Sequence, residues 1–374
     1  MKKNTLKNYF FLLAFIYTLG SCNDPVFYTI SQEVAPVTAR IDGAPSNFAL
    51  LGNTLYVASG SRLFRYAGWD REAPPGGKIM QIAATGNSLY ALCYQDTDSS
   101  TSLILKKFND DKSWTTLSGN TGGYNSIQYI YAAGNILFIG AESSNSFMIF
   151  YLDDNDQNPR IEALMLTNGQ PASGEISGAV YDGTNYFICT RGRGIYTIGG
   201  SAMQATLIND TTHFAGMICL KDGGPVIAIT RNGRLHSITT SGKSEEIAYF
   251  DRPVTGALTV WRDENNTPQL LLAGRQDMLE YNIDSGYTYG YMEIELDLSR
   301  PNGIKEDAGF REPGIRAPTS VIDGDNERFK STIGKHPVNA IFQAPDGTLF
   351  ASTQKSGVWS YRQRNGKFQW NAEE

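Results

Sequence analysis

Residues 183–198 read Gly-Thr-Asn-Tyr-Phe-Ile-Cys-Thr-Arg-Gly-Arg-Gly-Ile-Tyr-Thr-Ile. Apolar, β-branched and aromatic residues lie on both sides of a turn that contains glycine, which is the pattern of two strands joined as a hairpin. Variants of this stretch recur along the chain, at 52–58, 86–92, 134–140, 223–229, 267–273 and 346–352. The recurrence predicts a fold made of repeated β-units.

The repeats are spaced like the blades of a β-propeller. Their anchor residues are Leu55, Leu89, Leu137, Tyr186, Val226, Leu270 and Leu349. Neighbouring anchors are 34 to 49 residues apart, close to the span of about 40–50 residues that a four-stranded blade needs. The last pair is 79 residues apart, and the interval contains a stretch rich in proline, glycine and charge. We interpret it as an insertion at about 299–337; an eighth blade is the alternative.

Each repeat has partner strands on both sides. Third strands are expected at 63–66, 147–151, 195–198, 235–238, 279–282 and 358–361, and weaker fourth strands at 160–166, 205–208, 246–250 and 367–370. One such unit cannot bury both faces of its sheet, whereas stacking units around a ring does. The sequence therefore predicts an all-β fold, a single β-propeller of about seven four-stranded antiparallel blades (six to eight possible), with little helix.

The strand before each repeat is expected to be the innermost strand of its blade. Glycine is frequent there, which fits a strand crowded against the central axis, where a large side chain would clash. The aligned, axis-lining positions are Asn47, Gln81, Tyr129, Gly178, Gly216, Gly256 and Asn339. The amides in this set leave open the alternative that the axis holds a calcium ion or a column of water. Amides without a carboxylate, however, bind hard cations weakly. No cofactor and no resident metal are expected.

One repeat carries a family resemblance. Residues 346–361 run Asp-Gly-Thr-Leu-Phe-Ala-Ser-Thr and then Gly357-Val-Trp-Ser-Tyr361, which resembles the propeller repeat of periplasmic two-component sensor domains. The stretch at 183–198 resembles it more loosely. The resemblance implies the seven-bladed fold, and it implies no shared activity because function belongs to sites rather than folds.

The first residues resemble a bacterial lipoprotein signal peptide. Lys2, Lys3 and Lys7 precede an apolar run at 9–19 that is too short to span a bilayer, and the run ends in Leu-Gly-Ser-Cys22. The resemblance implies cleavage after residue 21 and lipidation of Cys22, for example with palmitate. We expect residues 1–21 to be the signal peptide, 22–40 a tether with a possible ring-closing strand, and 41–374 the propeller. The expected location is the cell envelope, anchored to a bacterial membrane and facing the periplasm or the cell surface.

Charge narrows the choice of partners. The chain carries a net charge of −6, and removal of the signal peptide makes it more negative, so nucleic acid is not expected to bind. Positive side chains nevertheless recur in the turns after the repeats, at Arg62, Arg191, Arg193, Arg231, Arg234, Arg275 and Lys355. These turns share one face of a propeller, so they predict a basic rim for an anionic partner, either a protein, a peptide or a glycan. The alternative is that these cations pair with carboxylates of neighbouring blades or are simply solvated side chains of exposed turns.

Motifs for catalysis are missing from the sequence. No G-x-S-x-G and no H-E-x-x-H occurs, and the three histidines, His213, His236 and His336, are far apart. Cys93, Cys189 and Cys219 lie in apolar runs and lack metal-site spacing. The acidic stretches 153–158 and 323–327 lack the full calcium-loop pattern and are interpreted as solvated turns.

We therefore expect a membrane-anchored, monomeric propeller that binds an envelope protein or an anionic ligand through one rim and is not an enzyme. A metal-assisted hydrolase or lactonase-like enzyme at the channel mouth is one alternative. A ligand-sensing module that reports to a membrane partner is the other.

Overall fold

The computed structural model describes residues 41, 43–94, 103–117, 126–143, 146–155, 160–199, 203–209, 213–239, 243–250, 253–275, 290–305, 337–364 and 367–373. All of them belong to one compact unit, Ala39–Glu374. Within these ranges the regular secondary structure is β-strand. A search of the same residues for a helix with the length and apolarity of a membrane span found none.

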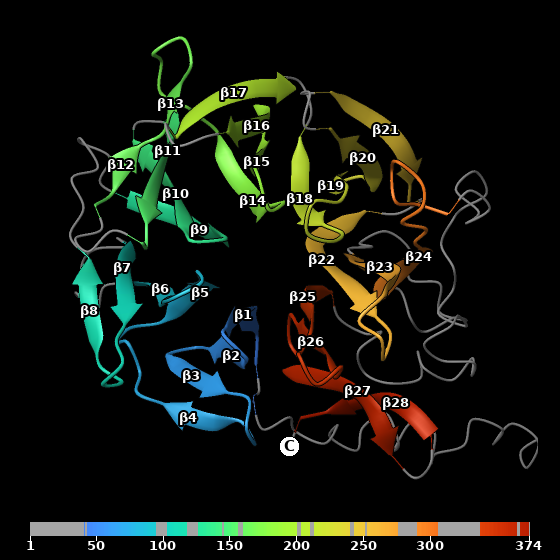
Figure 1. Ribbon diagram of the computed structural model, residues 1–374. Helices are drawn as coiled ribbons and strands as arrows, with labels where there is room; N and C mark the ends of the chain where they lie inside the picture. The colour runs from blue at the N-terminus through green and yellow to red at the C-terminus, as the bar shows by residue number, and fades with distance from the viewer. Residues whose placement is uncertain are drawn as a thin grey trace, which may run out of the picture. The chain divides into compact units, whose positions relative to one another are not determined.

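The strands form seven sheets, each built from consecutive strands, and the fold is an all-β, seven-bladed β-propeller (Figure 1). The expected fold class is therefore confirmed. Every anchor residue predicted from the repeats lies in the second strand of its blade.

The first three blades have four strands each. Blade 1 holds β1 (Pro45–Leu51), β2 (Thr54–Ser59), β3 (Arg62–Arg65) and β4 (Asp70–Glu72). Blade 2 holds β5 (Ile79–Ala84), β6 (Leu89–Tyr94), β7 (Leu103–Phe108) and β8 (Trp114–Leu117). Blade 3 holds β9 (Ser126–Ala133), β10 (Ile136–Ser143), β11 (Ser146–Asp153) and β12 (Glu162–Ala163).

The next two blades follow the same plan, with one added strand. Blade 4 holds β14 (Glu175–Tyr181), β15 (Tyr186–Arg191), β16 (Gly194–Gly199) and β17 (Gln204–Asn209). Its fifth strand, β13 (Met165–Leu166), pairs in parallel with β17. Blade 5 holds β18 (Phe214–Cys219), β19 (Val226–Thr230), β20 (Arg234–Ile238) and β21 (Ser244–Tyr249).

The last two blades differ in the number of described strands. Blade 6 holds β22 (Val254–Arg262), β23 (Pro268–Arg275) and β24 (Tyr291–Glu295). Blade 7 holds β25 (Val338–Gln343), β26 (Leu349–Thr353), β27 (Val358–Arg364) and β28 (Lys367–Ala372).

Two strand predictions need correction. The third strand of blade 6 is Tyr291–Glu295, later in the chain than the expected 279–282, which lies outside the described residues. The predicted fourth strand at 160–166 is divided: its first part pairs with β11 in blade 3, whereas Met165–Leu166 joins blade 4. The first error arose because β24, although buried, carries glutamate at 293 and 295 and so lacks an apolar run; the second arose because β12 and β13 have two residues each and are partly exposed. The tether expected at 22–40, with its possible ring-closing strand, and most of the expected insertion lie outside the described residues.

The first strands of the blades form the ring. β1, β5, β9, β14, β18, β22 and β25 each contact the next one, and β25 contacts β1. Figure 1 shows these strands nearest the centre, with later strands of each blade progressively further out. The second strands β19 and β26 are buried along their whole length, because adjacent blades cover both of their faces. The cores accordingly lie between blades: one cluster joins Tyr90 and Leu92 of blade 2 to Leu137 and Ile139 of blade 3.

Every inner strand contains a β-bulge near its start, where the register with the second strand shifts. In blade 4 Gly178 pairs with Cys189 after the bulge, and in blade 7 Ala340 pairs with Ser352 in the same way. Asn339 occupies the bulge itself, so the expected alignment is off by one residue in blade 7. In blade 6 the corresponding residue, paired with Ala273, is Leu258, so the predicted Gly256 is off by two. The extra residue of a bulge is invisible to an alignment made from sequence spacing.

The predicted crowding of the inner strands has a specific geometry. A Cβ added to Gly216 would lie 2.5 Å from the carbonyl oxygen of Gly256 in the next blade. One added to Gly178 would lie 3.0 Å from the backbone nitrogen of Met217. Neighbouring inner strands therefore approach so closely that their backbones leave no room for a side chain at these positions.

Candidate functional site

The antiparallel order of each blade decides which loops share a face. Turns between the second and third strands lie at the same edge as the connections to the next blade's first strand. We call this the 2–3 face; it includes the turns at 60–61, 192–193, 231–233 and 354–357. All seven cations of the predicted rim are in or beside 2–3 turns.

An inner hollow of about 320 Å³ opens on the 2–3 face where blades 4 to 7 meet. Its larger polar side chains are those of Arg191, His213, Arg231, Asn339 and Gln354. The remaining described lining residues are Phe214, Ala215, Val254, Thr255 and Pro337. Most of these residues are at the start of an inner strand or directly precede one, so the hollow lies on the axial side of the blades. The structure thus brings two rim arginines and one predicted axis residue into a single concavity.

An outer hollow of about 620 Å³ adjoins the inner one and shares Arg231 and His213 with it. Its other described lining residues are Thr230, Asn232, Arg234, His236, Glu246 and Pro253. They belong to blade 5 and to the connection that follows it. Both hollows have volumes in the range of small-ligand sites, about 300–1,000 Å³.

The arginines around the two hollows differ in their partners. Arg191 forms an ion pair of 2.5 Å with Glu175, and Arg234 forms one of 2.7 Å with Glu246, each within its own blade. Arg231 is exposed, and its guanidinium has no hydrogen bond or ion pair with any residue that the structure describes. Arg231 is therefore the cation at this site whose donors are available to a ligand.

The other predicted rim cations line neither hollow. Arg62, Arg193 and Lys355 are exposed in their turns. Arg275 is half-buried at the end of β23 and takes part in an interaction of its own. The predicted rim is therefore not one continuous site: Arg191, Arg231 and Arg234 line the two hollows, and the other four predicted cations lie outside them.

The predicted axis residues include two that join blades instead of facing a ligand. Asn47 accepts a 3.0 Å hydrogen bond from the backbone nitrogen of Ile82 and donates one of 2.5 Å to its oxygen. The side-chain oxygen of Gln81 accepts a 3.0 Å bond from the nitrogen of Ile130 in blade 3. Hydroxyls do the same elsewhere: Ser177 donates to Phe214, Thr255 to Val338 and Ser352 to Ser46.

Tyr129 lies beside the carboxylate of the Arg191 pair. Burial raises the pKa of its phenol to about 12, and the hydrogen bond with Glu175 and that residue's charge act in the same direction. Tyr129 therefore stays neutral and helps to fix Glu175, which in turn holds Arg191 at the edge of the inner hollow.

His236 lies under the outer hollow as a buried, neutral imidazole. Its exposed fraction is 9%, and its Nδ1 lies 3.2 Å from the hydroxyl of Ser244. Its Nε2 is buried without a hydrogen-bond partner. Burial lowers the pKa of the imidazole; the charge of Glu246 opposes this shift and that of Arg234 supports it. A buried polar nitrogen without a partner marks a place where a bound group can restore a hydrogen bond.

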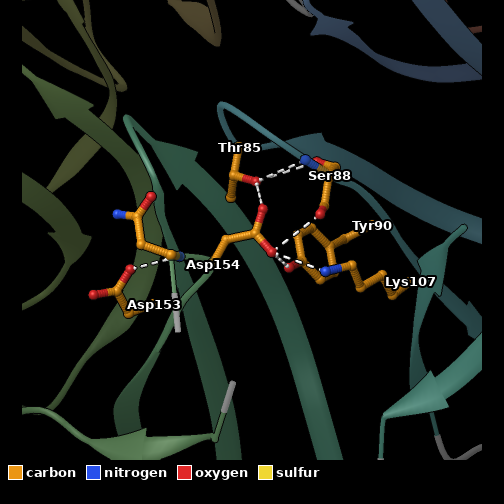
Figure 2. A network of polar contacts seen from close by, with 7 residues as sticks. Thr85, Ser88, Tyr90, Lys107, Asp153 and Asp154 are labelled. Carbon is orange, nitrogen blue, oxygen red and sulfur yellow. Dashed lines mark hydrogen bonds and ion pairs between the residues drawn. The ribbon is translucent and has the colours of Figure 1, made fainter. Parts of the chain in front are cut away.

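A second polar cluster, shown in Figure 2, is centred on Asp154. Its carboxylate accepts hydrogen bonds from Thr85 at 2.6 Å, Ser88 at 3.0 Å and Tyr90 at 2.6 Å, and it pairs with Lys107 at 3.0 Å. The prediction that this stretch is a solvated turn is wrong for Asp154, whose side chain is 1% exposed. Because every donor comes from blade 2 and Asp154 follows the third strand of blade 3, the cluster joins two blades. Its acceptors are fully used, so we assign it to structure.

Metal-binding clusters are missing from the residues that the structure describes: no group of three or more His, Cys, Asp or Glu side chains converges there. Cys93 and Cys189 are buried free thiols, and Cys219 is a partly exposed one. His336 lies outside the described residues.

Comparison with known proteins supports the fold. No family model matches the sequence, and no curated protein matches it. Two similar solved structures are the extracellular domain of the putative hybrid two-component system BT4673 from B. thetaiotaomicron, at 14% identity and TM-score 0.51, and that of the putative one-component system BT4673, at 13% and 0.52. They match 86% and 88% of this chain, which spans only 38% and 40% of theirs.

A third similar structure is the Mitotic Checkpoint Complex, with 11% identity, a TM-score of 0.55, and coverage of 86% of this chain and 90% of the other. Identities this low establish a shared fold and nothing about ligands. The similarity to extracellular domains of sensor systems agrees with the resemblance found in the repeat at 346–361.

Proposed function

We propose that the chain is a lipid-anchored propeller of a bacterial cell envelope that binds an anionic partner on its 2–3 face and carries out no chemistry. The observation that supports this proposal most strongly is Arg231. It is exposed, it lines both hollows, and no described residue neutralises it. The partner is an envelope protein or an anionic glycan or peptide.

Neighbouring groups suit a carboxylate at Arg231. An arginine can donate two parallel hydrogen bonds to a carboxylate, which gives both direction and strength. His213, Asn339 and Gln354 add further polar groups from blades 5 and 7. The net negative charge of the chain disfavours non-specific binding of polyanions, so a local cation is needed to select one.

The test is binding of two immobilised polyanions, poly-L-glutamate and polygalacturonate, to the purified full chain. Arg231→Glu should weaken binding at least tenfold, because it reverses the charge in both hollows. The matched control is Lys243→Glu, which makes the same charge change in blade 5, in the turn between β20 and β21 on the opposite face. Equal affinities for the wild type and Arg231→Glu, or no binding either of these polyanions or of a peptide that carries a single carboxylate, would contradict the proposal.

The envelope anchor is proposed from the sequence at Cys22. A thioether-linked diacylglycerol on this thiol supplies about 0.8 kcal/mol per buried methylene, and two chains hold a protein stably on a bilayer. Cys22→Ser should abolish incorporation of labelled palmitate and move the protein from the membrane fraction to the soluble fraction. Unchanged membrane association of Cys22→Ser would contradict lipidation as the anchor.

A further inference from the structure

The outer hollow contains groups of both hydrogen-bonding types next to Arg231. The hydroxyl of Thr230 donates to the side-chain oxygen of Asn232, which leaves the Asn232 amide nitrogen as a donor. Both carboxylate oxygens of Glu246 accept from Arg234, and each can accept a second hydrogen bond from a ligand. His236 adds the unpartnered Nε2 beneath. A ligand that fits this hollow therefore carries neutral donors and acceptors in alternation.

The charge distribution argues against a small dianion. The inner hollow offers Arg231 with His213, but the outer hollow also contains the carboxylate of Glu246. A second carboxylate placed there would be close to Glu246 and would meet an arginine, Arg234, that is already neutralised at 2.7 Å. A ligand with one negative group near Arg231 and neutral polar groups in the outer hollow matches the charges of both hollows.

The lining also argues against a saccharide. Pyranose rings are usually held against exposed aromatic faces. Among the described residues that line the two hollows, Phe214 is the single phenyl, phenol or indole ring, and it is fully buried. A polypeptide needs no such platform, because its backbone offers alternating N–H donors and C=O acceptors.

We propose that the two hollows together bind a peptide segment that carries one aspartate or glutamate side chain. The side-chain carboxylate binds Arg231 at the boundary with the inner hollow. The adjoining peptide backbone lies in the outer hollow, where it donates to Glu246 and accepts from Asn232. This inference rests on the proposed function and names its ligand class: a neutral-flanked acidic segment of a partner protein.

The experiment uses an array of nonapeptides with Asp or Glu at the centre and random neutral flanking residues, and a matched array with Asn or Gln at the centre. The full-length wild-type chain should select the acidic array with defined preferences on one flank. For the selected peptides, measured free in solution by fluorescence anisotropy, Arg231→Gln should lower affinity at least tenfold. Asn232→Ala should lower it three- to tenfold and relax the flank preference.

Two outcomes separate the inference from the proposed function. If trigalacturonate binds in an Arg231-dependent way and no arrayed peptide does, the peptide assignment is overturned and anion binding stands. If the neutral array binds as well as the acidic one, Arg231 does not select a carboxylate and the peptide inference is overturned. If no peptide, saccharide or polyanion binds, the proposed function and the peptide inference are both overturned. The control is again Lys243→Glu, for which peptide affinity should be unchanged.

Discussion

The indole nitrogen of Trp69 donates a 2.6 Å hydrogen bond to the carboxylate of Glu373, although 304 positions separate the two residues. Trp69 follows β3 of blade 1, and Glu373 follows β28 of blade 7, so the bond crosses the seam at which the ring closes. Glu373 also accepts from Ser360 and pairs with Arg362 at 2.8 Å. Beside it, Phe350 of blade 7 packs edge-on against Trp69, with ring centroids 5.2 Å apart.

Replacing Glu373 should therefore weaken ring closure. Glu373→Ala leaves the buried donors of Trp69 and Ser360 without a partner, and we expect it to lower the free energy of unfolding by about 2–4 kcal/mol. Urea-induced unfolding followed by tryptophan fluorescence measures this. The control, Glu264→Ala, removes an exposed carboxylate in a turn and should change stability by less than about 0.5 kcal/mol. Equal effects of the two variants would show that the seam bond contributes nothing specific.

The Asp154 cluster predicts a pH-dependent stability. Burial alone would raise the pKa of this carboxyl group, but the hydrogen bonds from Thr85, Tyr90, Lys107 and Ser88 outweigh it and lower the pKa below its ordinary value of 3.8. A group with a depressed folded-state pKa stabilises the fold fully above its unfolded value, and this contribution is lost as the pH falls through the folded pKa.

Asp154→Asn should lower the free energy of unfolding at neutral pH by about 2–4 kcal/mol, because an amide nitrogen then faces hydrogen-bond donors. The difference from the wild type should shrink as the pH falls below 3.8. Denaturant titrations at a series of pH values measure it. Asp153→Asn is the control, since among the described residues this neighbouring side chain accepts a hydrogen bond from the backbone nitrogen of Asn155 in its own turn. A difference that persists unchanged in acid would contradict the charged role of Asp154.

The amide of Asn47 predicts a third stability effect. It bonds both backbone groups of Ile82 in the next blade, so no other residue type of its size can replace it. Asn47→Leu should cost about 1–3 kcal/mol by leaving these buried groups without partners. Asn53→Leu, in an exposed turn of the same blade, provides the comparison in thermal unfolding. If Asn47→Leu unfolds at the wild-type temperature, the amide bonds do not hold the blades together.

The close approach at Gly216 predicts a steric effect. Gly216→Ala places a methyl group 2.5 Å from the Gly256 oxygen, so the two inner strands must separate, at a cost of about 1–3 kcal/mol. Gly169→Ala distinguishes a clash from backbone strain: its φ is +81° but no atom lies within 4 Å of the new Cβ. We expect strain alone to cost about 1 kcal/mol there. A Gly216→Ala variant as stable as the wild type would exclude a steric clash at Gly216.

Much of the fold could be predicted from the sequence because each blade repeats a local pattern. Second strands such as Val226–Thr230 are buried on both faces and read as uninterrupted apolar runs, so all seven were placed correctly. The third strand of blade 6 is buried but carries glutamate at 293 and 295, so it does not read as an apolar run and was misplaced. Blade 3 was divided from blade 4 at the wrong residue because β12 and β13 have only two residues each.

The candidate site could be predicted only as a set of cations on one face. Alternating strand direction alone places Arg191 and Arg231 on the 2–3 face. Which cations are neutralised depends on distances across strands that spacing does not contain: Glu175 reaches Arg191 and Glu246 reaches Arg234, whereas Arg231 has no described partner. His236 and Asp154 carried no sequence signal for their burial, because one lies in an ordinary strand and the other in an acidic turn.

The sequence by itself determined a propeller of about seven blades and the approximate position of the strand that begins each one, because a repeating apolar pattern is a local property of the chain; the structure fixed the number at seven. Only the tertiary structure decided that the amides of Asn47 and Gln81 join blades, that the Trp69–Glu373 bond crosses the closing seam, and that two hollows meet at Arg231. These features depend on closing the ring, which brings distant residues together at distances that no local pattern encodes.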